Sequence, residues 1–215
     1  YYAWQWGDAL FVVLDPYWHT PPSRGGPSGD NPWNPTLGKT QYDWLATTLR
    51  ASKAKYKFLF IHQLVGGLDK SGRGGAEAAG LYEWGGHEPG GANTFAARRP
   101  GWEQPIHTLL FETGVTIVFH GHDHFFAHQE KDGIVYQLTP QPAHRNQRSH
   151  QAEEYGYATG DFLPNSGHLR VHVGSDGVEV SYIRSATPDT QRGGAKNGEV
   201  AFRYRCGAPA DRKKP

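Results

Sequence analysis

Four histidines stand within nine residues in the middle of the chain, at a spacing suited to metal chemistry. They are His120, His122, His124 and His128. Neutral imidazole is a common ligand for zinc, iron, manganese and related ions. If the segment is extended, His122 and His124 point the same way and converge on one centre, and Gly121 lets the backbone turn or approach closely. The alternative is a polar strand end whose histidines only form hydrogen bonds.

A further histidine, His62, follows an apolar run at 57–61 that is typical of a buried strand. The His120–His124 segment follows a second such run, at 115–119. In open α/β sheets, ligand sites lie at the carboxyl ends of the strands. We therefore expect His62 and the His120–His124 segment to meet at one edge of a sheet.

The elements that must position these histidines alternate between strand and helix and end in hairpins. The predicted strands are 9–14, 57–61, 115–119, 134–138, 168–173 and 178–184, and the predicted helices are 39–53 and 102–113. Residues 17–38 predict a long surface loop, residues 143–164 a polar irregular segment, and the chain from Gly193 a solvated end. This order predicts an α/β fold with helices packed against a sheet.

Composition limits the chemistry that is available. The chain has 215 residues, 22 Lys+Arg, 21 Asp+Glu and a single cysteine, Cys206. The net charge of +1 excludes a broad electrostatic footprint for nucleic acid or an anionic membrane. One cysteine excludes an internal disulfide framework and a thiolate zinc cluster, so a metal site must use histidine and carboxylate. No apolar run approaches the roughly 20 residues that span a bilayer.

One competing zinc motif differs from this chain in its register. The metallo-β-lactamase signature, His-x-His-x-Asp-His, requires aspartate and then histidine where the chain has His124 and Phe125. We therefore do not favour that class.

The segment Phe119–His124, together with the strand before it, resembles the Gly-His-x-His motif of the calcineurin-like metallophosphoesterases, the purple acid phosphatase-like superfamily. Residues 58–62 resemble the strand-ending histidine of that family, and residues 6–15 resemble the strand after its third metal motif. The segment from Gly167 is similar to its closing hairpin, so the resemblance covers most of residues 1–184.

The resemblance implies a fold and a division of the chain. The fold would be α/β, part of a four-layer α-β-β-α metallophosphoesterase sandwich with a C-terminal β-hairpin. Residues 1–184 would form the C-terminal portion of one domain. Residues 185–215 would form a polar tail that packs on this domain or trails from it.

Carried over residue by residue, the resemblance also implies a binuclear centre. His62 and His122 would bind one metal ion and His124 the other. The cofactors would be two divalent or trivalent ions (Mn, Fe or Zn), roughly 3.5–4 Å apart, that hold the oxygens of a phosphate mono- or diester for in-line displacement. The protein would then be a phosphoester hydrolase, and the resemblance points to an extracellular or periplasmic location.

Three further motifs of the family are absent from the chain. They are Asp-x-His, Gly-Asp-x-x-Asp/Tyr and Gly-Asn-His-Asp/Glu, which supply the bridging carboxylate, an asparagine ligand and a catalytic histidine. Asp8 precedes a strand rather than following one, so we interpret it as a turn residue. Because the missing motifs normally lie upstream and the chain starts at Tyr1, we expect it to be the C-terminal half of a domain. An upstream segment or another chain would complete it, and alone it would be inactive.

Other side chains are candidates for contacts with the metal ligands or the phosphoester substrate. They are Asp123, His120, His144, His19, Arg145 and Arg148. Asp123 would orient a neighbouring imidazole as an acceptor, and His120 would pack at the strand end or bind metal. The two arginines would form charge-assisted bonds with phosphate, or else they are simply solvated.

The glycine-rich stretch 63–101 lacks a clear period. It contains Trp84, His87, Arg98 and Arg99. A loop of this length inside a compact domain predicts either a lid over the site or an ordinary mobile insertion.

The alternative function belongs to another class. Seven Trp and eleven Tyr could let a non-catalytic sandwich module bind carbohydrate or protein through aromatic surface residues. Metal content, measured together with hydrolysis of an aryl phosphate, separates the two hypotheses.

Overall fold

The computed structural model describes residues 1–22, 29–143, 151–164, 166–186, 188 and 196–208. The strands are β1 Tyr2–Trp6, β2 Ala9–Val13, β3 Tyr56–Ile61, β4 Ile117–His120, β5 Phe126–Lys131, β6 Ile134–Leu138, β7 Asp161–Leu163, β8 Gly167–Gly174, β9 Gly177–Arg184 and β10 Val200–Cys206. The helices are α1 Gly38–Ala51, the 3-10 turn η1 Ala78–Gly80, α2 Tyr82–Gly85, α3 Phe95–Arg98, α4 Ile106–Glu112 and α5 Gln151–Glu154.

The strands form two sheets, and the larger one positions the histidines. Its order is β1-β2-β3-β4-β6-β5-β7, and the smaller sheet has the order β10-β9-β8. Strands β2, β3, β4 and β6 are parallel neighbours, whereas β1, β5 and β7 pair antiparallel. The carboxyl ends of the four parallel strands therefore meet at one edge of the larger sheet.

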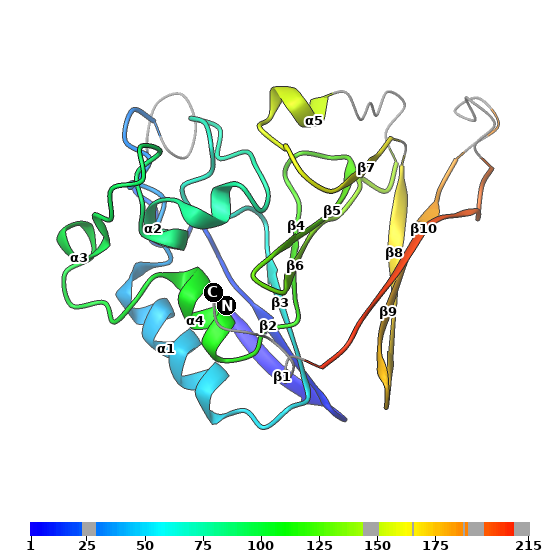
Figure 1. Cartoon of the computed structure of the whole chain (residues 1–215), viewed down its shortest axis with the longest axis horizontal. Helices are drawn as coiled ribbons and strands as arrows, with labels where there is room; N and C mark the ends of the chain where they lie inside the picture. The colour runs from blue at the N-terminus through cyan, green and yellow to red at the C-terminus, as the bar shows by residue number, and fades with distance from the viewer. Residues whose placement is uncertain (23–28, 144–150, 165, 187, 189–195, 209–215) are drawn as a thin grey trace.

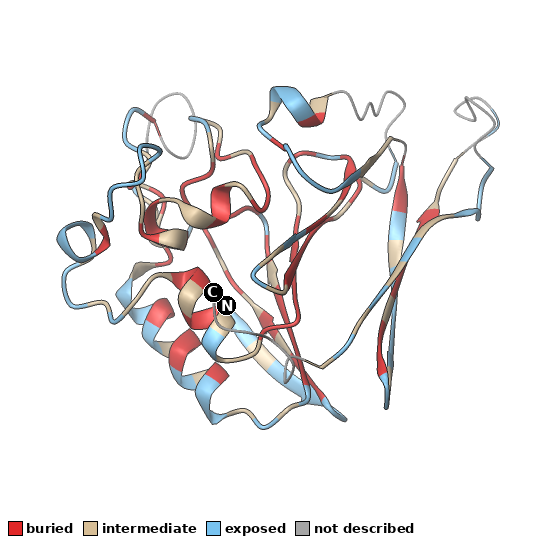
Figure 2. Cartoon of the chain, viewed as in Figure 1, coloured by how far each residue is buried: buried red, intermediate tan, exposed pale blue. Residues whose placement is uncertain are grey.

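Helices cover one face of the larger sheet, and the smaller sheet covers the other (Figure 1). Tyr42, Leu45 and Leu49 of α1 are buried in the helix-side core, as their helical spacing predicts. Helix α4 begins at Ile106, later than the predicted residue 102, because Pro105 has an extended backbone (ψ 153°) and a proline disfavours the helical conformation in the residue before it. Figure 2 shows the buried residues along the central strands and on the sheet-facing sides of both helices.

A second core joins the two sheets. Phe58 and Phe119 of the larger sheet belong to the same buried cluster as Val178 and Val180 of β9. Strands β8 and β9 pair from Gly167↔Arg184 to Gly174↔Gly177, which is the predicted C-terminal hairpin. The layers of helix, sheet and sheet confirm the predicted α/β fold class.

Several strands were not predicted. Strand β5 pairs with β6 through Asp132 and Gly133, both at positive φ (51° and 72°), as a type I′ hairpin turn requires. Strand β10 pairs with β9, so the prediction of a solvated end is wrong for Val200–Cys206. Its basic residues Arg203 and Arg205 are exposed and alternate with half-buried neighbours, the pattern of an amphipathic strand.

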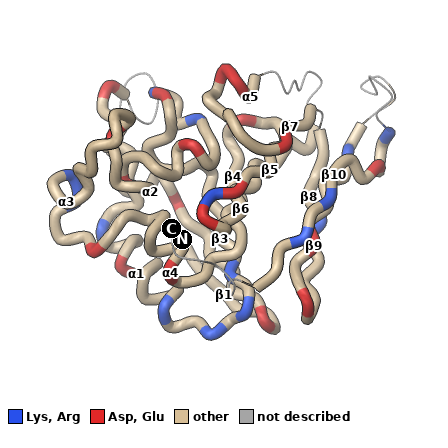
Figure 3. The backbone as a smooth tube through the Cα atoms, in the orientation of Figure 1, with Lys and Arg blue, Asp and Glu red and all other residues tan. Residues whose placement is uncertain are grey.

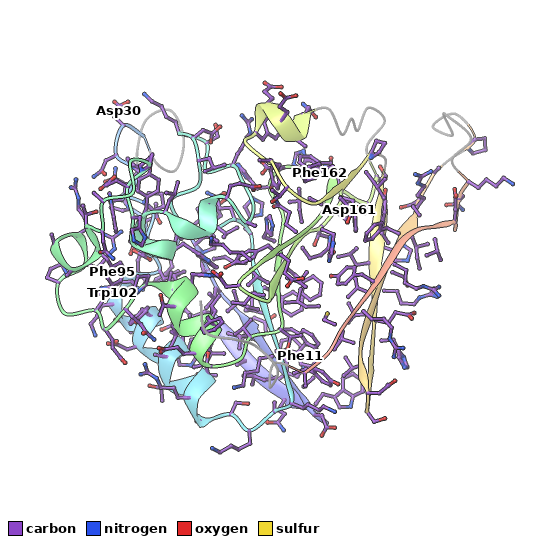
Figure 4. All side chains as sticks on the ribbon, in the orientation of Figure 1. Phe11, Asp30, Phe95, Trp102, Asp161 and Phe162 are labelled. Carbon is purple, nitrogen blue, oxygen red and sulfur yellow. The ribbon has the colours of Figure 1, made fainter. Side chains whose placement is uncertain are left out.

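The stretch 63–101 is a packed part of the domain. Trp84 is fully buried in the helix-side core and donates a hydrogen bond from Nε1 to the Tyr136 hydroxyl at 3.0 Å. Phe95 lies beside Trp102 with their rings edge to face, 6.3 Å apart (Figure 4). The prediction of a lid or a mobile insertion is therefore wrong for this core-forming part of the stretch.

Charged residues of both signs are distributed along the backbone of the helical layer and the sheets of the described chain (Figure 3). None of the described helices is long and apolar enough to cross a membrane. The extracellular or periplasmic location stays a prediction.

Candidate metal centre

His62 and His122 meet at the carboxyl edge of the larger sheet. Strands β3 and β4 are parallel, with Ile61 opposite His120, and the Gly121 N–H donates to the His62 carbonyl at 2.9 Å. His62 Nε2 lies 3.2 Å from His122 Nδ1, and the ring centroids are 5.3 Å apart. Two imidazoles separated by 60 residues in sequence thus face each other.

The loop after β4 is left-handed rather than extended. His122 has φ 81° and His124 has φ 70°, whereas Gly121 is not at positive φ. The segment is therefore not extended, as the prediction assumed, and Gly121 does not turn it through a positive φ. The convergence of His122 and His124 on one centre stays a prediction. Non-glycine residues in this region of φ carry strain of order 1–3 kcal/mol each, and such strain clusters at functional sites.

The carboxylate of Asp123 holds this strained loop in place through hydrogen bonds to residues outside it. Its buried carboxylate accepts hydrogen bonds at Oδ2 from the Tyr157 hydroxyl at 2.7 Å and the Gly74 N–H at 3.0 Å. Its Oδ1 lies 3.9 Å from Arg73 Nε. We predicted that Asp123 accepts from an imidazole; the structure instead ties it to the stretch 63–101 and to Tyr157. Its role is to fix the backbone between the two left-handed histidines.

The surroundings favour neutral imidazole at this edge. Burial lowers the pKa of His62 below its usual value, and the nearby His122 and His124 lower it further, while Asp123 opposes the shift. Burial raises the pKa of Asp123, with the bonds from Gly74 and Tyr157 opposing that rise. Metal binding requires the unprotonated imidazole, so a lowered histidine pKa suits a ligand.

His120 differs from the other histidines because it is buried at the end of β4. Its Nε2 has no hydrogen-bond partner in the described structure, and burial lowers its pKa to about 3. A neutral side chain packed at the strand end is one of the two roles predicted for it.

The remaining candidates lie elsewhere or outside the described residues. The ring of His19 lies against Gly38 at the start of α1, where an added Cβ would collide with it. His128 faces Asp161 Oδ2 at 3.3 Å, and its ring lies 4.1 Å from that of Tyr204, so it stabilises the sheets. His144, Arg145 and Arg148 fall in the segment 144–150, outside the described residues.

The histidine pair fits part of a metal centre. His62 is exposed, His122 is half-buried, and the nearest atoms of the two rings are His62 Nε2 and His122 Nδ1. Within the described ranges, no group of three or more His, Cys, Asp or Glu side chains is placed to hold a metal ion. The chemistry of two imidazoles suits zinc, manganese or iron, but the described donors do not form a binuclear site by themselves.

Comparison with known proteins identifies the fold. No protein-family model matches the chain, and no curated protein matches it. Among solved structures, the chain is similar to PhoD, with 15% identity and a TM-score of 0.57 over 97% of this chain and 44% of that one. The chain therefore shares the fold of PhoD.

Two other solved structures are also similar to the chain. GAP50, described as the anchor in the inner membrane complex of Plasmodium, is 13% identical, with a TM-score of 0.53 over 93% of this chain and 49% of that one. Purple acid phosphatase PPD1 from yellow lupin (Lupinus luteus) seeds is 11% identical, with a TM-score of 0.48 over 96% of this chain and 32% of that one. The chain spans less than half the length of these structures, and at such identity the likeness extends to the fold alone.

Sequence reasoning missed the residues that support the loop. Tyr157 and Gly74 lie 34 and 49 residues from Asp123, and neither belongs to a motif. Tyr17 and Gln63, which are bonded to each other beside His62, follow strands β2 and β3. The strand-end rule that identified His62 would have found these two.

Removing the Tyr157 hydroxyl tests the anchor. We expect Tyr157→Phe to lower the free energy of unfolding by about 1–3 kcal/mol, because a buried carboxylate loses a hydrogen bond. Tyr155→Phe is the matched control, since Tyr155 is half-buried and its hydroxyl accepts a hydrogen bond from Gln151 Nε2 at 3.0 Å rather than contacting Asp123. Urea unfolding measures both, and equal losses in the two variants would contradict the anchoring role.

Proposed function

We propose that this chain supplies part of the binuclear metal centre of a phosphoester hydrolase, acting on phosphate mono- or diesters. In this proposal His62 and His122 hold one ion and His124 contributes to the other. The observation that carries it is the 3.2 Å approach of His62 Nε2 to His122 Nδ1 at the carboxyl edge of a metallophosphoesterase fold.

The geometry of the chain supports this division of roles. The bond from Gly121 N–H to the His62 carbonyl holds the two strand ends in register, and the Asp123 anchor holds His122 and His124 on one short loop. Bound ions of this kind act as Lewis acids toward phosphate oxygens. The chain's own contribution is to hold neutral imidazoles at fixed positions.

The proposal includes a partner that completes the site. In the part of the chain that the structure describes, no third His, Cys, Asp or Glu joins the histidine pair. We infer that the remaining ligands, including a bridging carboxylate, come from outside the described residues, in an upstream segment or another chain. The alternative of a non-catalytic carbohydrate- or protein-binding module is not favoured by the comparisons.

Alanine variants test the ligand assignment. We expect His62→Ala and His122→Ala each to weaken zinc binding at least tenfold, because each removes a nitrogen donor from the same ion. His168→Ala is the control, since His168 is exposed on β8. Isothermal titration calorimetry with zinc measures the affinity. Unchanged zinc affinity in both ligand variants would contradict the assignment.

Activity tests the need for a completing partner. We expect the isolated chain, supplied with Mn²⁺, Fe³⁺ or Zn²⁺, not to turn over an aryl phosphate monoester or diester. Turnover is expected once the completing segment is present, and it should disappear in His122→Ala. Full turnover by the isolated chain would contradict the proposed partner. A completed protein with neither metal nor turnover would contradict the hydrolase proposal.

A further inference from the structure

Tyr17 and Trp18 lie at the same edge of the larger sheet as the histidine pair. Strand β2 runs parallel to β3, with Val13 opposite Phe60, and the Leu14 N–H donates to the Phe60 carbonyl at 2.9 Å. Residues that follow β2 therefore leave the sheet beside those that follow β3. This places the turn after β2 next to His62.

This turn is held rigidly by hydrogen bonds. Asp15 Oδ1 accepts from the N–H groups of Tyr17 at 2.8 Å and Trp18 at 3.1 Å, which makes an Asx-type turn. The side chain of Gln41, fully buried in α1, bonds to both the N–H and the carbonyl of Asp15 at 2.8 and 2.9 Å. The two aromatic residues are thus presented by a fixed backbone.

The ring of Tyr17 lies beside His62. Its hydroxyl donates to Gln63 Oε1 at 2.8 Å, and its ring centroid lies 5.8 Å from that of His62. Gln63 is itself buried, packed so closely on Gly72 that an added Cβ there would collide with its amide. Tyr17 therefore has a fixed position beside His62.

Both aromatic side chains remain open to solvent. Tyr17 is 47% exposed and Trp18 is 76% exposed. Aromatic rings gain stabilisation by stacking on other flat groups. Two adjacent exposed rings on a rigid turn, of which that of Tyr17 lies beside His62, therefore provide a surface on which a flat group can stack.

We infer that Tyr17 and Trp18 form an aromatic platform for the alcohol part of the substrate, and that the substrate class is phosphoesters with a flat aromatic group. This inference rests on the proposed function, because it takes the phosphate to bind at His62 and His122. The flat group is that of a simple aryl ester or of a nucleoside.

Non-hydrolysable ligands test the platform without relying on turnover. The zinc-loaded chain is titrated by calorimetry with phenylphosphonate and methylphosphonate, which share the phosphonate group. We expect phenylphosphonate to bind about three- to tenfold more tightly. A second pair, adenosine 5′-monophosphate and ribose 5-phosphate, distinguishes the two sources of the ring. If only phenylphosphonate binds more tightly than its partner, the substrates are simple aryl esters. If adenosine 5′-monophosphate also binds more tightly than ribose 5-phosphate, the substrates include nucleotides.

Matched variants show which side chain causes the preference for phenylphosphonate over methylphosphonate. Trp18→Ala should bring the ratio of the phenylphosphonate and methylphosphonate affinities close to one without changing the methylphosphonate affinity. Tyr17→Phe should keep the ratio, since the ring remains. Trp6→Ala is the control, because Trp6 is 79% exposed but lies before the turn that leads into β2, at the opposite end of that strand.

The outcomes separate this inference from the proposed function. Equal affinities for phenylphosphonate and methylphosphonate in the unmodified chain, or an unchanged ratio in Trp18→Ala, would overturn the platform alone. No phosphonate binding by a chain that does bind zinc would contradict the phosphate site of the proposed function and the platform with it. Failure to bind zinc at His62 and His122 would contradict the proposed function and the platform with it.

Discussion

Replacing Arg99 with alanine should lower the free energy of unfolding by about 3–5 kcal/mol, because a buried carboxylate then loses its countercharge. Glu83 is fully buried in α2, and its Oε2 lies 2.5 Å from Arg99 Nε. Its Oε1 accepts from the Leu37 N–H at 2.8 Å. Burial raises the pKa of Glu83, and the charge of Arg99 is the largest opposing influence.

The same arginine joins three segments of the chain. Its Nη2 donates to the Trp33 carbonyl at 2.6 Å, and its guanidinium lies over the rings of Trp33 and Trp102 at 5.3 and 5.9 Å. Arg99→Lys should recover only part of the loss, since an ammonium group cannot reproduce the planar guanidinium fork.

A neighbouring arginine provides the control for this prediction. Arg98 is half exposed and lies 4.0 Å from Glu88, so Arg98→Ala should cost less than about 1 kcal/mol. Guanidinium unfolding at neutral pH measures the three variants. Equal losses for Arg98→Ala and Arg99→Ala would contradict the account of the buried pair.

The metal-free protein should lose stability as the pH falls below 6.5, and His120 should account for much of the loss. Burial lowers the pKa of His120 to about 3 in the folded chain. Between that value and the usual 6.5, the unfolded chain binds the proton and the folded chain does not. The contribution of His120 is therefore complete above pH 6.5 and declines by up to about 1.4 kcal/mol per pH unit below it.

Substitution by leucine isolates the contribution of His120. The difference in unfolding free energy between His120→Leu and the unmodified chain should shift in favour of the variant as the pH is lowered from 7.5 to 4.5. His168→Ala, at an exposed position, should follow the unmodified chain throughout this range. Parallel pH profiles for His120→Leu and the unmodified chain would show that another group is responsible.

The elements with strong patterns could be predicted from the sequence. The apolar runs at β3 and β6 lie within one residue of their observed bounds, and Gly174–Gly177 marks the observed hairpin. Strand β10 was missed because two of its seven residues, Arg203 and Arg205, are basic and exposed, and nothing local shows that β9 lies beside it. Pairing between distant segments decides such strands.

The candidate site could be predicted only in part, because it too depends on contacts between distant segments. Two strand ends that each carry a histidine were enough to bring His62 and His122 together. The left-handed backbone at His122 and His124 depends on Asp123, whose partners Tyr157 and Gly74 are distant in sequence. No local pattern specifies contacts of this kind. The role of the histidines as metal ligands stays a prediction.

Anomalous diffraction from crystals of the zinc-loaded protein, recorded on both sides of the zinc edge, tests the central claim most directly. We expect a zinc peak about 2.0–2.1 Å from a ring nitrogen of both His62 and His122, with His124 beside a second position. Zinc bound away from His62, or His62 and His122 still bonded to each other with no zinc between them, would contradict the claim.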